Sequence, residues 1–217
     1  MKSAVVFGAT GLVGSHLVQE LNTNNTYEVI YVVVRSNFQI ESHKIKIINS
    51  DYSNLDKDLD NVNATDAFIC LGTTIKKAGS VEVVEQIDRD LPIQIAQILK
   101  VKNTQNLAVV SSVGAQSASK NYYLRIKGEM EEGLINQNFN HLAIVRPSII
   151  LGKRSEARIA ETIGKAVMRI LGVFMVGGLK KYRAIHARTI ARSMINILNN
   201  KHEGIIFESD QLQVLGR

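Results

Sequence analysis

The feature that most constrains this chain is a glycine-rich turn near residue 10. The apolar run Val5-Val6-Phe7 leads directly into the turn, in which glycines occupy positions 8, 11 and 14. From Leu12 to Leu21 apolar residues recur at helical spacing. The pattern therefore predicts a buried strand, a tight turn and the start of a helix, in that order.

Each glycine of this turn has a separate task if the turn holds a dinucleotide. Gly8 permits a sharp reversal of the chain, Gly11 lets the backbone approach a pyrophosphate, and Gly14 lets the helix pack closely on the strand. The N–H groups and the positive dipole end of the helix attract phosphate. The spacing G-x-x-G-x-x-G has one residue more than the usual G-x-G-x-x-G. Its position after a strand near the start of the chain nevertheless favours a nucleotide cofactor over a bare strand-helix turn.

Composition places the chain among ordinary globular proteins. Its 217 residues are 45% apolar and include two prolines, so we expect a single domain over 1–217 in which about 148–217 forms a smaller substrate-binding part. The opening Met1-Lys2-Ser3 leaves no room for a signal peptide, and no apolar stretch approaches the roughly 18 residues of a membrane span. We therefore expect a cytoplasmic protein.

Cysteine and histidine usage gives no indication of a metal site. Cys70 is the only cysteine, and the five histidines show no H-x-x-x-H pairing. An internal disulfide and a thiolate metal cluster are both impossible with one cysteine. We expect no metal.

The net charge of +6 is concentrated in the last third of the chain. Residues 1–150 contain 14 Lys and Arg against 15 Asp and Glu, whereas 151–217 contain 12 against 5. This asymmetry indicates an acidic small-molecule substrate, an acidic partner or a membrane surface, with solvated basic helix faces as the alternative. No aromatic-interleaved basic platform is present, so we expect no nucleic acid. The apolar stretch 159–179 would form core or a pocket lid, or dock on a membrane or on a second subunit of a homodimer.

Strand and helix patterns alternate along the chain, which predicts a doubly wound parallel sheet of the α/β class, the Rossmann fold, with a small C-terminal substrate-binding annex. Apolar and β-branched runs predict further strands at 27–34, 44–48, 67–71, 107–110, 141–146 and 204–207. Helices are predicted at about 53–60, 80–99, 123–138, 154–172 and 187–199. Pro92 is expected to kink or divide the second of these helices. Residues 75–79 are expected to form a mobile loop.

The residues that follow the second strand indicate which nucleotide the fold would bind. That strand ends at Arg35, and no carboxylate occurs between positions 29 and 40. An acidic residue here would bond the ribose 2′-hydroxyl of NAD, whereas a basic residue suits the 2′-phosphate of NADP. The sequence therefore favours NADP over NAD, with Arg35 as the phosphate clamp. The alternative role of Arg35 is an exposed cation at a strand end.

A phenol and an amine are spaced for acid-base chemistry. Tyr123 and Lys127 are four residues apart, so on a helix they project from one face. A phenol exchanges its proton poorly at neutral pH, and a nearby ammonium stabilises the phenolate. Ser111 or Ser112, at the end of the preceding strand, would offer a hydroxyl to a substrate carbonyl oxygen. Tyr122 competes for the phenol role, but it has no lysine four positions further on.

Together these motifs resemble the short-chain dehydrogenase/reductase superfamily, in its atypical and extended forms, over essentially the whole chain. The glycines, the strand-end serines, Tyr123-x-x-x-Lys127 and Arg146-Pro147 carry the resemblance. Longer strings resemble the Tat-interacting-protein group of atypical members; they are Leu71-Gly72-Thr73-Thr74, Lys77-Ala78-Gly79, Asp88-Arg89-Asp90, Ser111-Ser112-x-Gly114-Ala115 and Tyr123-Leu124-x-x-Lys127-Gly128-Glu129.

The resemblance implies an NADP-binding fold with Ser112, Tyr123 and Lys127 as the catalytic set. Tyr123 would exchange the proton, Lys127 would bind the nicotinamide ribose and tune Tyr123, and Ser112 would orient the substrate oxygen. Both Tyr123 and Lys127 also count among the implied cofactor contacts. The other implied contacts are Gly8, Thr10, Gly11, Leu12 and Val13 at the pyrophosphate, Arg35 at the 2′-phosphate, Asp51 at the adenine, Gly72 at the ribose and Pro147 beside the nicotinamide, with Gly14, Leu71, Thr73 and Ser111 completing the set.

Two departures from the superfamily pattern stand out. Many members have a helix asparagine that completes a proton relay, where this chain has Asp88. About seventy residues follow Pro147, too few for the nucleotide-sugar domain of extended members. We expect an NADP-dependent oxidoreductase that acts on a carbonyl or alcohol of a small molecule. The alternatives are an NADP-binding regulatory or protein-interaction module without turnover, and a sugar epimerase-like enzyme.

Overall fold

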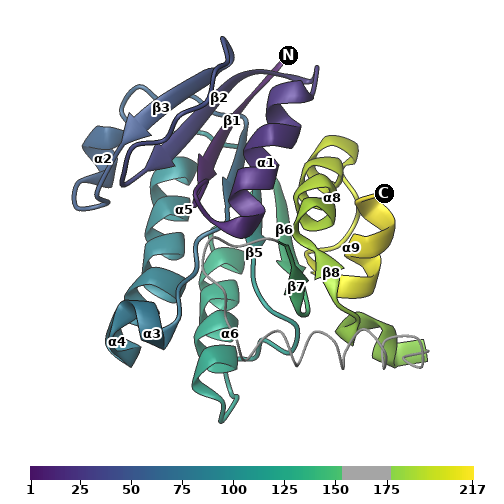
Figure 1. Cartoon of the computed structure of the whole chain (residues 1–217). Helices are drawn as coiled ribbons and strands as arrows, with labels where there is room; N and C mark the ends of the chain where they lie inside the picture. The colour runs from purple at the N-terminus through teal and green to yellow at the C-terminus, as the bar shows by residue number, and fades with distance from the viewer. Residues whose placement is uncertain (153–176) are drawn as a thin grey trace.

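The computed structural model describes residues 1–152 and 177–217, which form a parallel sheet between two layers of helices (Figure 1). The sheet has the strand order β3-β2-β1-β4-β5-β6-β9, and every neighbouring pair is parallel. Its described strands are β1 (Lys2–Phe7), β2 (Tyr27–Val34), β3 (Ile45–Asn49), β4 (Asp66–Ile69), β5 (Asn106–Val110), β6 (His141–Arg146) and β9 (Ile206–Glu208). The predicted doubly wound α/β fold is confirmed. The strand order reverses direction between β1 and β4, where such sheets bind ligands.

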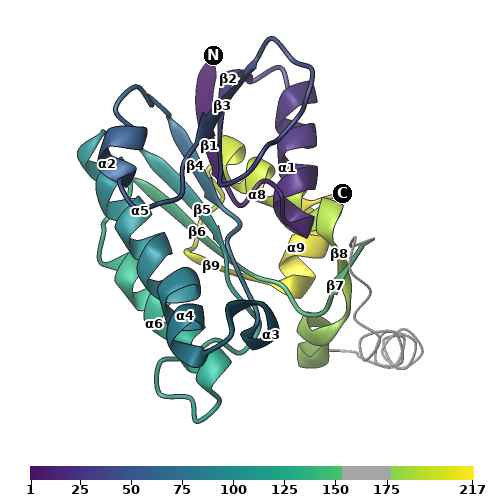
Figure 2. The same ribbon diagram turned by 60° about the vertical axis from the view of Figure 1, so that its left-hand side comes forward.

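Helices cover both faces of the sheet (Figure 2). On one face lie α1 (Leu12–Thr23), α8 (Ala187–Asn200) and α9 (Ser209–Leu215), and on the other lie α2 (Leu55–Asp58), α5 (Leu91–Val101) and α6 (Tyr122–Ile135). Alternate residues of β1 join opposite cores, since Val6 packs on the α1 side whereas Val5 and Phe7 pack on the α5 side. Because both faces are buried, the strands are continuous apolar runs in the sequence.

The chain between β4 and β5 contains more helical structure than we expected. Short helices α3 (Ile75–Ala78) and α4 (Val81–Glu85) are followed by a π-helical turn, η1 (Gln86–Asp90), which continues into α5. Helix α3 stands in place of the expected loop at 75–79, because the N–H groups of Lys77 and Ala78 donate to the Thr74 carbonyl. Pro92 lies in the first turn of α5, where its missing N–H costs no hydrogen bond. The division of the predicted helix therefore falls at η1.

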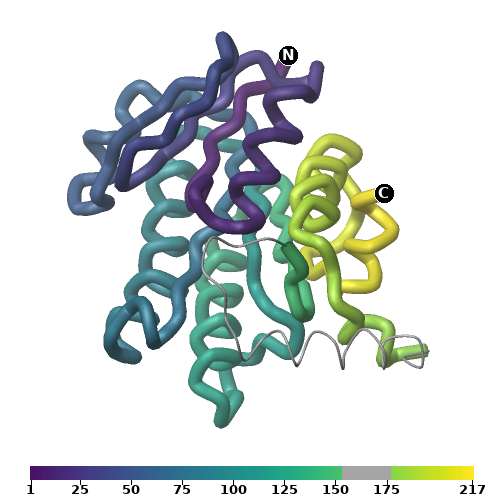
Figure 3. The backbone as a smooth tube through the Cα atoms, viewed as in Figure 1, coloured from purple at the N-terminus to yellow at the C-terminus, as the bar shows by residue number. Residues whose placement is uncertain are grey.

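The C-terminal part contains the predicted helix and strand at α8 and β9, and it also contains elements that the sequence did not predict. The helix predicted at 154–172 and most of the apolar stretch 159–179 fall outside the described residues. A separate two-stranded sheet joins β7 (Ile150–Leu151) to β8 (Ile185–His186), and the 3-10 helix η3 (Gly177–Tyr182) precedes it. Figure 3 shows the end of the chain beside α8. Helix α9, which we did not predict, begins with a capping box between Glu208 and Gln211. Within the described ranges, no helix has the length and apolarity to cross a membrane.

A buried polar cluster ties together the amino ends of four strands. The Asp66 carboxylate accepts hydrogen bonds from Tyr27 Oη at 2.6 Å and from Asn106 Nδ2 at 2.7 Å, and pairs with Lys2 Nζ at 3.0 Å. Burial, followed by the charge of Asp66, raises the pKa of Tyr27 well above its usual range. Lys2, Tyr27, Asp66 and Asn106 each begin a strand. This cluster therefore fixes strand register at one edge of the sheet and leaves the opposite edge for a ligand.

Candidate functional site

A cavity of about 700 Å³ lies at the carboxyl edge of the sheet, between β1, β4 and β5. Its walls come from the glycine turn, the segment 70–74 after β4, the helical turn η1, the end of β5 and the first turns of α6. A cavity of this size is within the range of cofactor and ligand sites. Its position is the crevice that the strand order predicts.

The glycine turn is shaped to hold phosphate. Gly8 has a φ of +81°, and a Cβ at this position would lie 2.5 Å from the carbonyl oxygen of Cys70. A Cβ on Gly14 would overlap the backbone of Gly8, so α1 can approach the end of β1 only because residue 14 is glycine. Gly11 is exposed and precedes α1 without a side-chain cap. The first N–H groups of α1 thus have no side-chain partner and face the cavity rim, an arrangement that fits a pyrophosphate.

Most of the predicted site residues meet at this cavity. Those that line it are Thr10, Gly11, Leu12, Val13, Leu71, Gly72, Thr73, Ser111, Tyr123 and Lys127. Gly8 and Gly14 lie behind the lining, where they shape the turn. Arg35, Asp51, Ser112 and Pro147 do not line it. Pro147 is buried just after β6, and its carbonyl accepts the N–H of Val113.

Arg35 and Asp51 follow the carboxyl ends of β2 and β3, and both are exposed. Hydrogen bonds from Ser53 lower the pKa of Asp51, whose carboxylate accepts the Ser53 N–H at 2.8 Å. Burial raises the pKa of Tyr52, and the positive charge of Arg35 opposes that rise. The side chain of Arg35 forms no hydrogen bond or ion pair with the residues that the structure describes. Its guanidinium is therefore available to an anion at this edge of the sheet.

The two strand-end serines have different surroundings. Ser111 is buried in the cavity wall, and its hydroxyl donates to Glu131 Oε1. Arg146 holds that carboxylate through Nε at 3.0 Å, and the hydrogen bond to Glu131 raises the pKa of Arg146. Ser112 lies outside the lining, and its hydroxyl donates to the Val113 carbonyl at 3.5 Å. The resemblance implies Ser112 as the substrate-orienting hydroxyl, but of the two serines it is Ser111 that lines the cavity.

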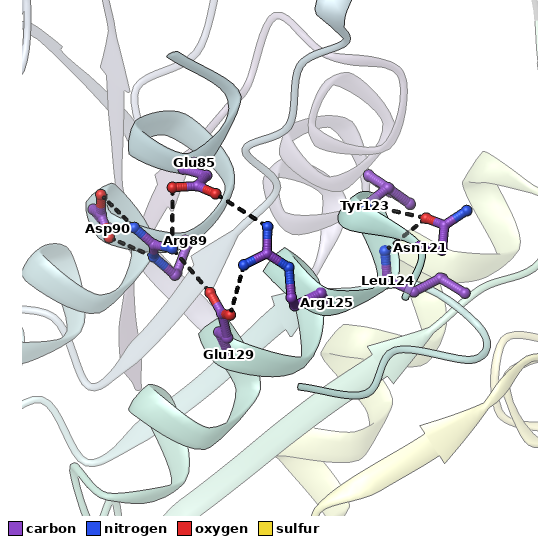
Figure 4. Close-up of polar contacts among 8 residues, drawn as sticks. All are labelled: Glu85, Arg89, Asp90, Asn121, Tyr123, Leu124, Arg125 and Glu129. Carbon is purple, nitrogen blue, oxygen red and sulfur yellow. Dashed lines mark hydrogen bonds and ion pairs between the residues drawn. The ribbon is translucent and has the colours of Figure 1, made fainter. Parts of the chain in front are cut away.

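Tyr123 and Lys127 reach the cavity from the same face of α6. The helix begins after Asn121, whose side chain accepts the N–H groups of Tyr123 at 3.0 Å and Leu124 at 3.2 Å (Figure 4). This N-cap fixes the first turn of α6 and with it the backbone of Tyr123. Tyr122 also lines the cavity and is 38% exposed. Spacing excludes Tyr122 from the pair with Lys127, but the geometry keeps it beside the site.

Asp88 is a site residue to which the sequence assigned no contact; it stood there in the string Asp88-Arg89-Asp90 and as a departure from the asparagine of many superfamily members. Its Oδ1 lies 2.8 Å from Lys127 Nζ, and both side chains are almost fully buried. Its Oδ2 accepts the N–H of Thr73 at 2.8 Å. The signal that could have found it is a carboxylate on the apolar face of a predicted helix, one turn after Val84, because buried carboxylates need partners.

Cys70 is a further lining residue that sequence reasoning did not single out for the site. It follows β4 directly and contacts the cavity beside Leu71. Burial raises the pKa of its thiol to about 12, so the group is a neutral thiol at physiological pH. Among residues 1–152 and 177–217, no group of three or more His, Cys, Asp or Glu side chains is placed to hold a metal ion.

Comparison with known proteins gives the same picture as the geometry. A family model described as NAD(P)H-binding matches residues 8–201. "Protein FMP52, mitochondrial" of Candida glabrata is 37% identical over 155 residues, which are 71% of this chain and 66%, just under two thirds, of that protein. "Protein HTATIP2" of Rattus norvegicus is 29% identical over 207 residues, which are 94% of this chain and 84% of that protein. The resemblance found in the sequence is therefore confirmed.

Solved structures show the same fold at low identity. The UDP-N-acetylglucosamine 4-epimerase from Methanobrevibacter ruminantium M1, in complex with UDP-N-acetylmuramic acid, has a TM-score of 0.70 at 18% identity. The match covers 95% of this chain and 76% of that one. At this identity the likeness concerns the fold alone.

The comparisons also correct the expected location. Relatives from several fungi are named mitochondrial proteins. The expectation of a cytoplasmic protein is therefore wrong, because it rested on the lack of a secretory signal, and that lack does not distinguish between compartments inside the cell. The family model matches residues 8–201, and the glycine turn lies at the cavity. The chain therefore belongs to the NAD(P)H-binding family, in the atypical short-chain dehydrogenase/reductase group of FMP52 and HTATIP2.

Proposed function

We propose that this protein is an NADP-dependent oxidoreductase that interconverts a carbonyl and an alcohol on a small molecule. The observation that carries the proposal is that Tyr123 and Lys127 line the same cavity as the glycine turn. The bound nicotinamide would supply the hydride acceptor or donor. The uncapped start of α1 supports the pyrophosphate end of such a cofactor.

The side chains at the inner end of the cavity would handle the oxygen of the substrate. The Tyr123 phenol would give a proton to that oxygen or take one from it, and the ammonium of Lys127 one turn away would stabilise the phenolate. Ser111 donates its own hydrogen to Glu131, so its oxygen is left to accept a hydrogen bond from a substrate hydroxyl. Ser112 remains the alternative that the resemblance implies.

The preference for NADP over NAD rests on Arg35. This exposed cation follows β2, the strand whose end faces the adenine ribose in folds of this type. Because Arg35 has no carboxylate partner among the described residues, its charge would be available to a 2′-phosphate. Asp51, at the neighbouring strand end, would lie near the adenine.

We further propose an anionic substrate and a mitochondrial location. The net positive charge of the chain is concentrated in 151–217, the part that we expect to build the substrate side, and this charge would attract an anionic substrate. Ile150 extends the lining toward the C-terminal part, in agreement with a substrate side built by about 148–217. The mitochondrial names of several fungal relatives support the location.

The decisive experiment measures NADPH consumption with a panel of aldehydes and ketones, half of them carrying a carboxylate or phosphate. Native protein should oxidise NADPH with at least one member of the panel, and Tyr123→Phe should lose that activity while still binding NADPH. Tyr122→Phe is the matched control, because Tyr122 lines the cavity without a lysine one turn away. Cofactor binding without turnover on any carbonyl would favour a regulatory NADP-binding module instead.

An epimerase-like enzyme is the second candidate, because a UDP-sugar epimerase shares this fold. Tyr123 and Lys127 would then exchange the proton on the oxygen of a transient ketone. Such an enzyme would interconvert sugar epimers with no net change in NADPH absorbance. A sugar-nucleotide panel followed by chromatography of the products distinguishes it from the oxidoreductase.

A further inference from the structure

The Asp88 carboxylate joins two parts of the cavity wall that are distant in the sequence. One oxygen lies 2.8 Å from the Lys127 ammonium on α6, and the other accepts the Thr73 N–H at 2.8 Å, in the segment 70–74 that follows β4. The same side chain borders Gly72, where an added Cβ would come within 3.4 Å of Asp88 Oδ1. Asp88 is therefore in contact with both Lys127 and residues 72–73.

Burial restricts the geometry of the contact between Asp88 and Lys127. The side chains of Asp88 and Lys127 are 1% and 3% exposed. A buried charge that loses its partner is strongly unfavourable, so each group constrains the position of the other. The ammonium has three N–H donors and gives one to Asp88, which leaves donors for the cavity that Lys127 lines.

A network of ion pairs outside the cavity joins the elements that carry Asp88 and Lys127. Arg89 Nη1 lies 2.9 Å from Glu129 Oε2 and 3.3 Å from Glu85 Oε2. Arg125 contacts the same two carboxylates at 3.5 Å (Figure 4). These four residues join α4 and η1 to α6 on the outer side, while Asp88 on the same π-helical turn meets Lys127 on the inner side. π-helical turns occur often at functional sites.

We propose that Asp88 is a positioning residue that sets the Lys127 ammonium and residues 72–73 in one geometry for the nicotinamide half of the cofactor. The inference rests on the proposed function, because it takes Lys127 and Gly72 as contacts of that half. An asparagine cannot do the same, because Lys127 and the Thr73 N–H contact different oxygens of Asp88, and in asparagine an NH₂ group would replace one of these oxygens and oppose its donor. The carboxylate thus accounts for the departure from the superfamily pattern.

The test compares NADPH binding by the native protein, Asp88→Asn and Asp90→Asn. Asp90 is on the same turn and pairs with Arg89 outside the cavity, so Asp90→Asn is the matched control. We expect Asp88→Asn to weaken NADPH binding roughly tenfold or more and to abolish the shift in nicotinamide fluorescence on binding, while Asp90→Asn behaves like the native protein. Circular dichroism below the unfolding temperature verifies that each variant is folded.

Two further variants separate position from charge. Asp88→Glu keeps the charge and both oxygens but moves them by one methylene. If position matters, this variant should also bind NADPH more weakly than the native protein. The double variant Asp88→Asn/Lys127→Met should be impaired less than the product of its two single effects, because both act through one pair. Native affinity in Asp88→Asn or Asp88→Glu, or fully independent effects in the double variant, would overturn the positioning role and leave the proposed function intact. Failure of the native protein to bind NADPH would instead overturn the proposed function together with this inference.

Discussion

The hydroxyl of Ser111 donates to the carboxylate of Glu131, and Arg146 holds that carboxylate from the other side at 3.0 Å. The three residues come from the end of β5, from α6 and from the end of β6. The wall of the cavity is thus a fixed polar network, and the oxygen of Ser111 keeps one orientation. This fixed orientation distinguishes Ser111 from Ser112, which has no comparable partner among the described residues.

We predict that Ser111→Ala lowers turnover more than Ser112→Ala does. Loss of the hydroxyl removes the hydrogen-bond acceptor for the hydroxyl of the alcohol form of the substrate and one donor from Glu131, which still keeps Arg146. The stability cost should be about 1 kcal/mol, visible in urea unfolding. Steady-state kinetics of the two variants with the same substrate provide the measurement. A larger loss in Ser112→Ala would assign the role to Ser112, as the resemblance implies.

Tyr123→Phe should reduce the rate of NADPH consumption by roughly 10²-fold to 10⁴-fold, the usual contribution of a positioned acid-base group. The affinity for NADPH should stay within about twofold of the native value, because the glycine turn and Lys127 are unchanged. Fluorescence titration and single-turnover kinetics measure the two quantities separately. Unchanged single-turnover kinetics in Tyr123→Phe, with a loss of rate in Tyr122→Phe, would assign the proton exchange to Tyr122.

Gly11→Val and Gly14→Ala should fail in different ways. Gly11 is exposed, and the nearest neighbour of an added Cβ is the Gly8 carbonyl oxygen at 3.1 Å, a tight contact that needs a small shift of the turn, so valine should cost some stability, leave the protein folded and block the pyrophosphate. A Cβ on Gly14 would overlap the Gly8 backbone, and this should destabilise the fold itself. We expect Gly11→Val to lose NADPH binding with a melting temperature moderately below the native one, and Gly14→Ala to melt far below it. Calorimetry with and without NADPH distinguishes them, and retained binding in Gly11→Val would rule out the turn as the pyrophosphate site.

The sequence was sufficient for features that depend on neighbouring residues. The glycine turn and β1 were readable because turn chemistry and burial on both faces leave a local pattern. The four-residue spacing of Tyr123 and Lys127 was readable because one helix carries both. The π-helical turn η1 left no such pattern, since its extra residue per turn is not distinguishable from α-helical periodicity over five residues.

Features that depend on long-range packing were not predictable. Asp88 and Lys127 are 39 residues apart, and only the packing of η1 on α6 makes them a pair. The choice between Ser111 and Ser112 depends on which face each side chain takes as β5 ends, and successive residues of a strand point to opposite faces. A shift of one residue therefore exchanges their roles, and the sequence does not fix the last residue of a strand that closely.

Arg35→Glu should shift the preference of the protein from NADP toward NAD. The carboxylate would repel a 2′-phosphate and accept a hydrogen bond from a 2′-hydroxyl, so we expect the NADPH affinity to fall by roughly tenfold or more and the NADH affinity to hold or rise. Lys57→Glu makes the same change of charge on an exposed residue of α2 that does not line the cavity. This variant controls for the effect of the changed net charge on cofactor binding. Titrations with NADPH and with NADH at two salt concentrations give the ratio of the two affinities. An equal ratio in the native protein and Arg35→Glu would exclude Arg35 as the clamp.

Alkylation of Cys70 should report the burial of the cavity wall. Burial raises the pKa of this thiol to about 12 from its ordinary value of 9.0, and the thiolate is the reactive form. Below a pKa of about 12 the thiolate fraction grows tenfold per pH unit, so the rate in the native protein should keep rising from pH 8 to pH 11. In urea the rate should be higher at pH 8 and level off above about pH 9. Mass spectrometry of iodoacetamide-treated samples measures both profiles. A native rate that levels off near pH 9 would contradict the burial of the thiol, and protection by NADPH would locate the cofactor beside β4.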